Sequence, residues 1–206
     1  MAALLDRPFD VVFLAGFAVY VALRGHYQSL AKGQETVERR RGAREVMLLV
    51  LVAIGCVLLP VAYLATPWLA FADYELPAAV RWAGVPAMVA GLWLFWRSHR
   101  DLGRFWSATL EIREGHQLVT TGIYRRIRHP MYAAIWLVSL AQGLLLGNWL
   151  AGWAAVAAFG AMYWLRIERE ERLLLDCFGE QWRAHCAVTG RLWPRLAAAS
   201  SPRSPA

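Results

Sequence analysis

The sequence predicts an all-α integral membrane protein with about five transmembrane helices. Its 206 residues are 58% hydrophobic and only 18% charged, whereas soluble domains carry about 25% charged residues. The apolar residues fall in a few long runs rather than in amphipathic stripes, and the positive charges fall between those runs. With three Cys and no Cys or His pattern at metal-ligand spacing, neither a disulfide scaffold nor a metal site is expected.

Five apolar stretches are candidates to cross a bilayer, which takes about 20 apolar residues per helix. Residues 9–24 form a short first stretch, and the number of spans depends on whether it crosses or lies at the interface. Residues 46–71 are long enough to cross with a tilt, and Pro60 and Pro67 predict a kink or an early end. Residues 78–96 form the third stretch. Residues 131–164 carry no formal charge and are expected to fold into a helical hairpin at Gly147-Asn148. A soluble helical domain explains this uncharged run poorly.

The positive charges predict the orientation of the chain. Of the 22 Lys and Arg residues, only Arg7 and Arg81 fall on one side of the expected spans. The positive-inside rule makes the other, Arg-rich side cytoplasmic, and the C-terminus lies on that side. A bacterial inner membrane is favoured by the Arg- and Ala-rich composition. Nucleic acid is not an expected partner, because the basic residues occur in every cytoplasmic connection instead of on one face with base-stacking aromatics.

Two cytoplasmic stretches on either side of the hairpin carry most of the remaining ionisable and aromatic residues. In the first, Pro130 suits the first turn of a helix with His129 at its cap, and Tyr132 can share a helix face with His129. Free N–H groups at such a helix start favour an anionic group, for example a carboxylate. The alternative is that the basic residues here are a topology signal and Tyr132 is an interfacial aromatic.

In the second stretch, Arg166 and Glu170 are one helical turn apart, so both can face one site. An arginine where the last span leaves the bilayer can hold a carboxylate or phosphate through paired hydrogen bonds. The alternative is a solvated helix with i,i+4 pairs such as Glu168–Arg172. Gly179 is expected to end this helix.

Together these segments resemble the isoprenylcysteine carboxyl methyltransferase family and its phospholipid N-methyltransferase relatives. The resemblance covers residues 102–194, which would be the catalytic part of a single domain of residues 1–196, followed by a disordered tail of residues 197–206. The motifs occur in the family's order and are His-x-Leu-Val-Thr-x-Gly-x-Tyr at 116–124, Arg-His-Pro-x-Tyr at 128–132, Arg-x-x-x-Glu-Glu at 166–171, Phe-Gly-Glu-x-aromatic at 178–182, and Pro194.

The resemblance implies a membrane enzyme with S-adenosyl-L-methionine as its cofactor, bound in a cytoplasmic pocket around the last helical hairpin and the C-terminal helix. Its acceptor would be a lipophilic small molecule or a lipidated substrate from the bilayer. Arg166 matches the family's substrate-side arginine, and Glu171 is a possible catalytic residue. The implied cofactor-binding residues are Thr109, His116, Gln117, Leu118, Val119, Tyr124, His129, Pro130, Met131, Tyr132 and Glu170.

The acceptor decides which residues take part in chemistry. A carboxylate is ionised at neutral pH and needs no base, so Arg166 would only orient it. An amine must lose a proton, for which Glu170, Glu171 or His129 are candidates. Two other functions stay open: a membrane sterol-type reductase that uses NADPH, whose C-terminal half shares the Arg-His-Pro-x-Tyr pattern, and a non-catalytic scaffold or transport protein. The absence of ionisable residues in the middle of the second, fourth and fifth stretches argues against an ion path. The oligomeric state is not predicted.

Overall fold

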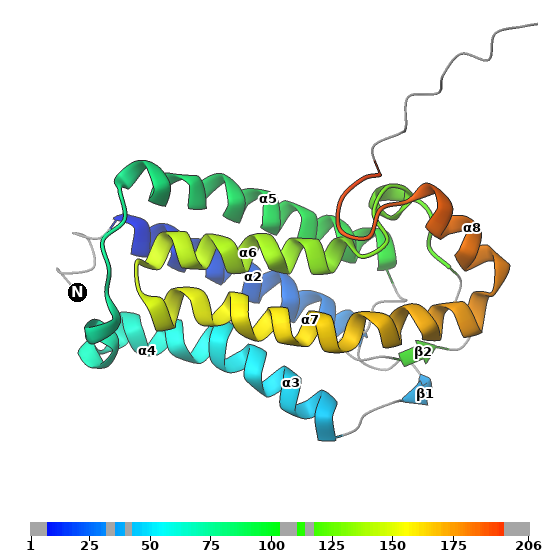
Figure 1. The fold of residues 1–206 in the computed structure, drawn as a ribbon, viewed down its shortest axis with the longest axis horizontal. Coiled ribbons are helices and arrows are strands. Elements are labelled where there is room, and N and C mark those ends of the chain that lie inside the picture. The colour runs from blue at the N-terminus through cyan, green and yellow to red at the C-terminus, as the bar shows by residue number, and fades with distance from the viewer. Residues whose placement is uncertain (1–7, 32–35, 40–42, 104–110, 114–117, 196–206) are drawn as a thin grey trace, which may run out of the picture.

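The chain folds into an elongated bundle of membrane-length helices with a small two-stranded ribbon and a short C-terminal helix at one end (Figure 1). The computed structural model describes residues 8–31, 36–39, 43–103, 111–113 and 118–195. The expected tail, residues 197–206, lies outside them. In chain order the elements are α2 (Pro8–Ala31), β1 (Thr36–Arg39), α3 (Ala43–Ala53), the π-helical turn η1 (Ile54–Leu58), α4 (Leu59–Ala65), the 3-10 helix η2 (Pro67–Ala72), α5 (Ala78–Leu102), β2 (Glu111–Arg113), the 3-10 helix η4 (Gly122–Arg125), α6 (Pro130–Leu146), α7 (Trp149–Phe178) and α8 (Glu180–Val188).

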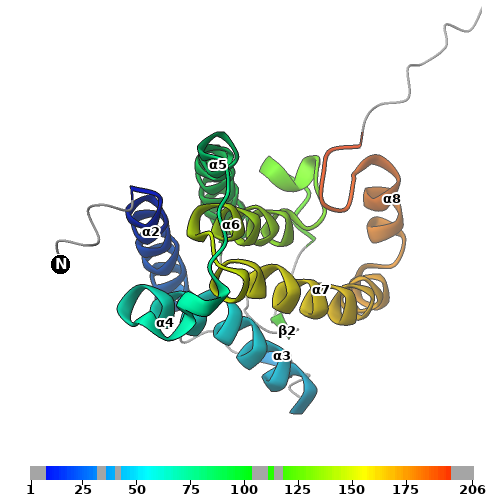
Figure 2. The ribbon, with the colours of Figure 1, turned by 60° about the vertical axis from the view of Figure 1, so that its left-hand side comes forward.

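Four helical segments are long and apolar enough to cross a membrane: Pro8–Leu30, Ala43–Ala65, Ala78–Leu102 and Trp149–Phe178. The predicted helical membrane fold is therefore confirmed. The hairpin's first arm, α6, has 17 residues, about 25 Å of helix at 1.5 Å per residue. It packs between α5 and α7 and also contacts α2 (Figure 2). Because α6 is shorter than the other four, the count of five spans stays a prediction.

The second span departs from a regular α-helix where the sequence predicts it. Its middle turn, η1, is π-helical and ends two residues before Pro60, which has no N–H to donate to the preceding turn. The helix ends at Ala65, and Thr66 caps the 3-10 helix that begins at Pro67. Gly55 lets this span approach α7 closely, since a Cβ atom there would lie 2.7 Å from the carbonyl oxygen of Ala154.

The tight turn between α6 and α7 is confirmed at Gly147-Asn148. Gly147 adopts a left-handed conformation with φ of 60°, which glycine reaches without strain. Asn148 caps α7, and its Oδ1 accepts hydrogen bonds from the amides of Leu150 (3.0 Å) and Ala151 (2.8 Å). Its Nδ2 donates to the carbonyl of Leu69 (2.7 Å) and to Asp73 Oδ1 (2.8 Å), which fastens the hairpin to η2.

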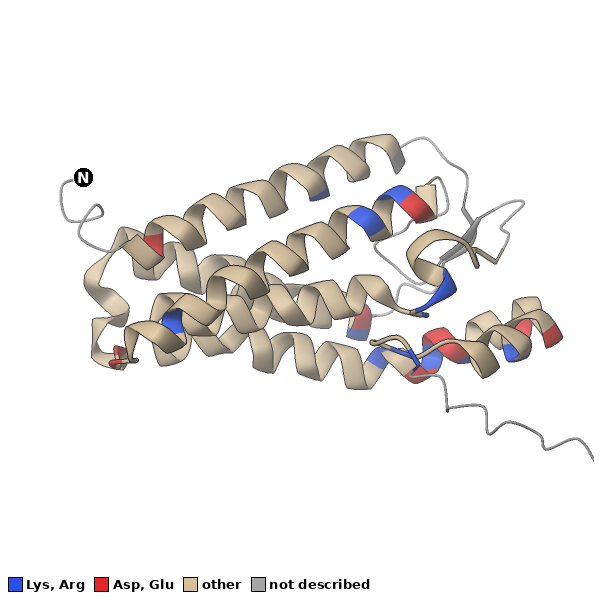
Figure 3. Ribbon diagram, turned by 90° about the horizontal axis from the view of Figure 1, so that it is seen from above, with Lys and Arg blue, Asp and Glu red and all other residues tan. Residues whose placement is uncertain are grey.

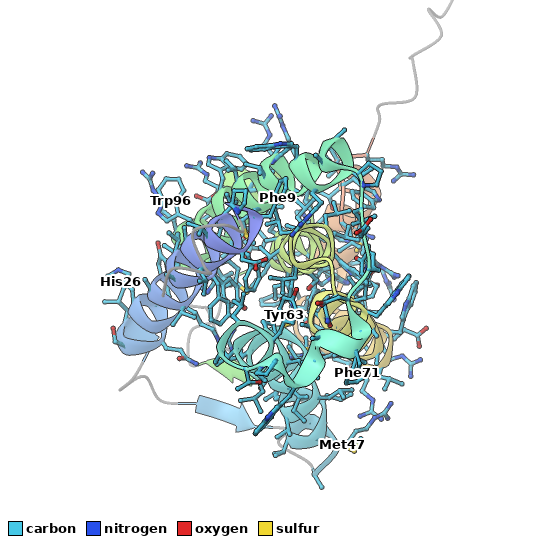
Figure 4. The ribbon with its side chains drawn as sticks, turned by 90° about the vertical axis from the view of Figure 1, so that its left-hand side faces the viewer. Phe9, His26, Met47, Tyr63, Phe71 and Trp96 are labelled. Atoms are coloured by element: carbon cyan, nitrogen blue, oxygen red, sulfur yellow. The ribbon has the colours of Figure 1, made fainter. Side chains whose placement is uncertain are left out.

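The surface separates an apolar bundle from one charged end. Figure 3 shows most of the described charged residues at the end formed by the C-terminal half of α7 and by α8, with few along the bundle. Seen from the opposite end, Met47 and Phe71 point outward (Figure 4), and Phe71 is 79% exposed. Apolar surface of this extent fits contact with lipid. The antiparallel pairing of β1 with β2 at the charged end was not predicted.

Candidate functional site

A cluster of ionisable side chains forms at the charged end, where the C-terminal half of α7 meets the start of α6. Pro130 is the first residue of α6 and His129 is its N-cap, both as predicted. The cap residue makes no side-chain hydrogen bond to the helix, which leaves the His129 ring available to the carboxylates of α7. The site therefore depends on the hairpin, since α7 returns along α6 to present its glutamates.

Glu170 lies at the centre of the cluster. The Tyr132 hydroxyl donates to Glu170 Oε2 at 2.6 Å, and His129 Nδ1 lies 3.6 Å from Glu170 Oε1. Arg166, one turn earlier on α7, places its Nε 3.7 Å from Glu170 Oε2. His129 and Tyr132 therefore share a face at the start of α6, and Arg166 and Glu170 share a face of α7, both as expected. These two faces contact each other.

Glu171 is held by three cationic side chains. His129 Nε2 lies 3.2 Å from its Oε1, and Arg128 Nε lies 3.6 Å from the same atom. Arg191 forms a two-pronged pair, from Nε to Oε1 at 2.9 Å and from Nη2 to Oε2 at 2.5 Å. Because these donors occupy both oxygens, the arrangement suits Glu171 for positioning His129. Glu168, by contrast, forms an exposed pair with Arg172, as the sequence predicts.

His129 bridges the two glutamates and is buried, with only 6% of its surface exposed. Burial alone would lower the pKa of its imidazole, but hydrogen bonds and charge interactions with Glu170 and Glu171 raise that pKa above its ordinary value. Each ring nitrogen faces one carboxylate, a geometry that suits the doubly protonated ring. The cluster therefore favours the positively charged form of His129.

The segment after α8 folds back over the start of α6. The amides of Arg128 and His129 donate to the carbonyls of Gly190 (2.8 Å) and Arg191 (3.0 Å), and the Gly190 amide donates to the Arg126 carbonyl (3.2 Å). The Trp182 ring of α8 lies 6.2 Å from the His129 ring. Sequence reasoning missed Arg191, because a lone arginine in a basic tail gives no sign of its partner.

Of the remaining predicted residues, Tyr124 and Met131 lie on the α5 side of the site. Tyr124 is buried, its hydroxyl lies 3.4 Å from the Ser98 carbonyl oxygen of α5, and burial together with Glu170 raises the pKa of its hydroxyl. Met131 packs in a cluster with Phe95 of α5. Leu118 and Val119 are half-buried. Outside the described residues lie Thr109, His116 and Gln117.

Arg166 has a second acidic neighbour that the sequence did not predict. Its Nη1 lies 3.1 Å from Oε1 of Glu45, which stands in the first turn of α3. Only 9% of the Arg166 side chain and 11% of the Glu45 side chain are exposed. In the sequence, Glu45 belongs to a polar connection between two apolar stretches. No local motif indicates that it pairs with Arg166.

The sequence profile of the isoprenylcysteine carboxyl methyltransferase (ICMT) family matches residues 83–176. That segment is 94 of the chain's 206 residues, a little under half. The match contains the His129–Tyr132 and Arg166–Glu171 motifs, so the resemblance proposed from the sequence is confirmed. The motifs after residue 176 and the contacts of Arg191 lie outside the matched segment.

Individual relatives agree with this family match. A protein-S-isoprenylcysteine O-methyltransferase of Dictyostelium discoideum is 36% identical over 77 residues, which are 35% of this chain and 31% of that protein. The cobalt-zinc-cadmium resistance protein CzcN of Cupriavidus metallidurans is 31% identical over 119 residues, 56% of this chain and 55% of CzcN. The chain thus spans from about a third to about half of the length of these relatives.

A solved structure supports the fold of this chain. The eukaryotic intramembrane Ras methyltransferase ICMT superposes with a TM-score of 0.52 at 22% identity, over 78% of this chain and 55% of the other. At this identity the likeness shows a shared helical membrane fold. Glu45 and the rest of α3 precede the family-matched segment, so the family match itself does not describe the Glu45–Arg166 pair.

Proposed function

We propose that this chain is an S-adenosyl-L-methionine-dependent methyltransferase that acts on a lipophilic acceptor from the bilayer. The observation that carries the proposal is the hydrogen-bonded cluster of His129, Tyr132 and Glu170, formed by motifs inside the ICMT-matched segment. The acceptor group is either a carboxylate, as on an isoprenylcysteine-like molecule, or a lipid amine. The named O-methyltransferase relatives support the general reaction.

The residues of the cluster fit this cofactor chemically. S-adenosyl-L-methionine carries a sulfonium, an ammonium and ribose hydroxyls, all of which interact favourably with a carboxylate. Glu170 offers one at the site, with a quarter of its side chain exposed. The residues proposed to hold the cofactor are Leu118, Val119, Tyr124, His129, Pro130, Met131, Tyr132 and Glu170, together with Thr109, His116 and Gln117, which lie outside the described residues.

The bound cofactor supplies a methyl group that is already activated by a positively charged sulfur. The protein's task is therefore to position the reactants, which can contribute on the order of 7–11 kcal/mol. The hydrogen bond from Tyr132 and the approach of His129 and Arg166 keep the Glu170 carboxylate in one orientation. Arg191 and Arg128 do the same for Glu171. No nucleophilic side chain is needed.

The proposed location is a bacterial inner membrane with the cluster and the C-terminus at the cytoplasmic face. The Arg-rich connections support this orientation by the positive-inside rule. The cluster includes residues of the C-terminal half of α7, at the charged end in Figure 3, while the Asp10–Arg81 ion pair joins the first turns of α2 and α5. A site at the cytoplasmic end of membrane helices has access both to a soluble cofactor and to lipids.

Calorimetric titration of the detergent-purified protein with S-adenosylhomocysteine, run beside NADPH, tests the proposal. We expect saturable binding of S-adenosylhomocysteine that is lost in Glu170→Ala and kept in Glu168→Ala, a matched removal of an exposed carboxylate from the same helix. Binding of NADPH alone would favour the reductase. Binding of neither ligand would contradict the methyltransferase proposal and favour a non-catalytic protein.

A further inference from the structure

Arg24 places a positive charge inside the first of the membrane-length helices. It belongs to α2, in which the apolar stretch long enough to cross a membrane runs from Pro8 to Leu30. After Arg24 the helix continues through residues 25–31, about 10 Å at 1.5 Å per residue. Arginines inside membrane helices are rare, and they mark sites that bind or move charged groups.

Arg24 lies on the side of α2 that packs against α5. The Tyr20 ring lies 4.7 Å from the Phe95 ring of α5, and the Tyr27 ring lies 4.7 Å from the His99 ring of the same helix. Arg24 is four residues after Tyr20 and three before Tyr27, so it shares their face. Helical side chains lean toward the N-terminus of their helix. Arg24 therefore reaches toward Tyr20, away from the charged end of the bundle.

The polar neighbours of the Arg24 guanidinium are uncharged or basic. The guanidinium lies within hydrogen-bonding range of the Tyr20 hydroxyl, and it interacts electrostatically with the Cys56 thiol of η1 and the His99 ring. The Cys56 thiol is in turn hydrogen-bonded to Ser139 of α6. None of these groups is an anion at neutral pH in its ordinary state. Arg24 thus faces the region where α2, η1, α5 and α6 meet.

Among the residues that the structure describes, no carboxylate pairs with Arg24. Neither η1 nor α6 contains a charged residue. On α5, Asp101 is paired with Arg97 at 3.0 Å, and the acidic residue of α2, Asp10, stands in the first turn of that helix. Arg24 is only half-buried, so part of its side chain is accessible. A guanidinium with several donors and no countercharge favours an anionic group, which it can bind through paired hydrogen bonds.

Arg24 is also close to the proposed methyltransferase site. Tyr20 and Leu23 of α2 pack against the same apolar cluster as Met131, which is the second residue of α6 and one of the residues proposed to hold the cofactor. A lipophilic molecule whose polar end contacts Arg24 would therefore lie beside that part of the site, on the side away from α7.

We propose that Arg24 is a recognition residue for the lipophilic acceptor and binds a carboxylate or phosphate of that molecule. The identity of this ligand as the acceptor rests on the proposed methyltransferase function. The anion is the carboxylate of a carboxylate acceptor, or the phosphate beside the amine of a phospholipid. Because α2 precedes residues 83–176, the ICMT family match assigns no role to Arg24.

Native mass spectrometry of the purified protein in a maltoside detergent, without cofactor, tests the anion site. The ligands are oleate, oleyl phosphate and oleyl alcohol, which share one chain and differ in the head group. We expect the wild type to bind at least one of the two anions about tenfold or more tightly than the alcohol. Arg24→Gln should reduce this preference at least about fivefold, and Arg24→Lys should keep part of it, because lysine retains the charge without the paired hydrogen bonds.

The two anions distinguish the sources of the charge. Tighter binding of oleate indicates a carboxylate, and tighter binding of oleyl phosphate indicates a phospholipid phosphate; either supports the site. Arg100→Gln is the matched control, because it removes the same charge from an exposed position on α5. Equal binding of all three ligands by the wild type, or a preference that Arg24→Gln leaves unchanged, would overturn the role of Arg24. Thermal unfolding shows whether Arg24→Gln is folded, and Arg24→Met serves if it is not.

Methyl transfer tests whether the bound anion belongs to the acceptor. With purified protein and methyl-labelled S-adenosyl-L-methionine, Arg24→Gln should need several-fold more lipid extract than Arg100→Gln for half-maximal incorporation, at unchanged S-adenosylhomocysteine affinity. An unchanged requirement for extract would overturn the acceptor role and leave the methyltransferase proposal intact. A wild type without S-adenosylhomocysteine binding would overturn the methyltransferase proposal, and the cofactor-free anion preference would still decide whether Arg24 forms an anion site.

Discussion

The hydrogen bond between Tyr132 and Glu170 gives a quantitative test of the site. It is 2.6 Å long, and Tyr132 is 92% buried by surface area, since only 8% is exposed. A hydrogen bond to a charged group contributes about 1.5–3 kcal/mol, which corresponds to roughly 10- to 150-fold in an equilibrium constant. In Tyr132→Phe, His129 and Arg166 still lie close to Glu170. We therefore expect the low end of this range, about a tenfold loss of S-adenosylhomocysteine affinity.

A double-mutant cycle shows whether Tyr132 acts through Glu170. Calorimetry on wild type, Tyr132→Phe, Glu170→Gln and the double variant should show that the Tyr132 effect shrinks to below about threefold once Glu170 is gone, because contacting residues are not additive. Tyr74→Phe is the control, because the Tyr74 hydroxyl donates a hydrogen bond to the Gly143 carbonyl, near the hairpin turn and away from the cluster. Equal effects of Tyr132→Phe in both backgrounds would refute the coupling.

Three further predictions follow from the fold and the cluster. Asn148→Ala removes a helix cap and two donated hydrogen bonds, so it should lower the free energy of unfolding in detergent by about 2–4 kcal/mol; a loss below about 0.5 kcal/mol would contradict the role of this turn. The pKa of His129 is raised in the folded protein from 6.5. The stability that His129 contributes is therefore complete below pH 6.5 and is lost as the pH rises through the folded pKa. The free energy of unfolding measured against pH should show this loss, and His129→Gln should abolish the pH dependence. Arg191→Ala should weaken S-adenosylhomocysteine binding several-fold by releasing Glu171, with Arg191→Lys in between because lysine cannot form the two-pronged pair; identical affinities in both variants and wild type would exclude a positioning role.

Local patterns in the sequence predicted most of the long helices, and the ends of those around the hairpin. The long uncharged run and Gly147-Asn148 predicted the hairpin, and Pro130 and Gly179 predicted the start of α6 and the end of α7. The one-turn spacing of Arg166 and Glu170 predicted their shared face, which depends only on helix geometry.

Contacts between distant segments could not be predicted in this way. The Glu45–Arg166 pair joins α3 to α7, and the Arg191–Glu171 pair depends on how the segment after α8 folds back. Neither partner carries a local signal, since surface arginines and glutamates are common in polar connections.

Methyl transfer itself is the most direct test of the central claim. Membranes containing the protein are incubated with S-adenosyl-L-methionine labelled in its methyl group, and the label in the extracted lipid phase is counted. We predict incorporation by the wild type and by Glu168→Ala, and none above background by Glu170→Ala. Incorporation by Glu170→Ala equal to that of the wild type would contradict the account. So would a wild type that binds S-adenosylhomocysteine but incorporates no label into any of a range of lipid extracts.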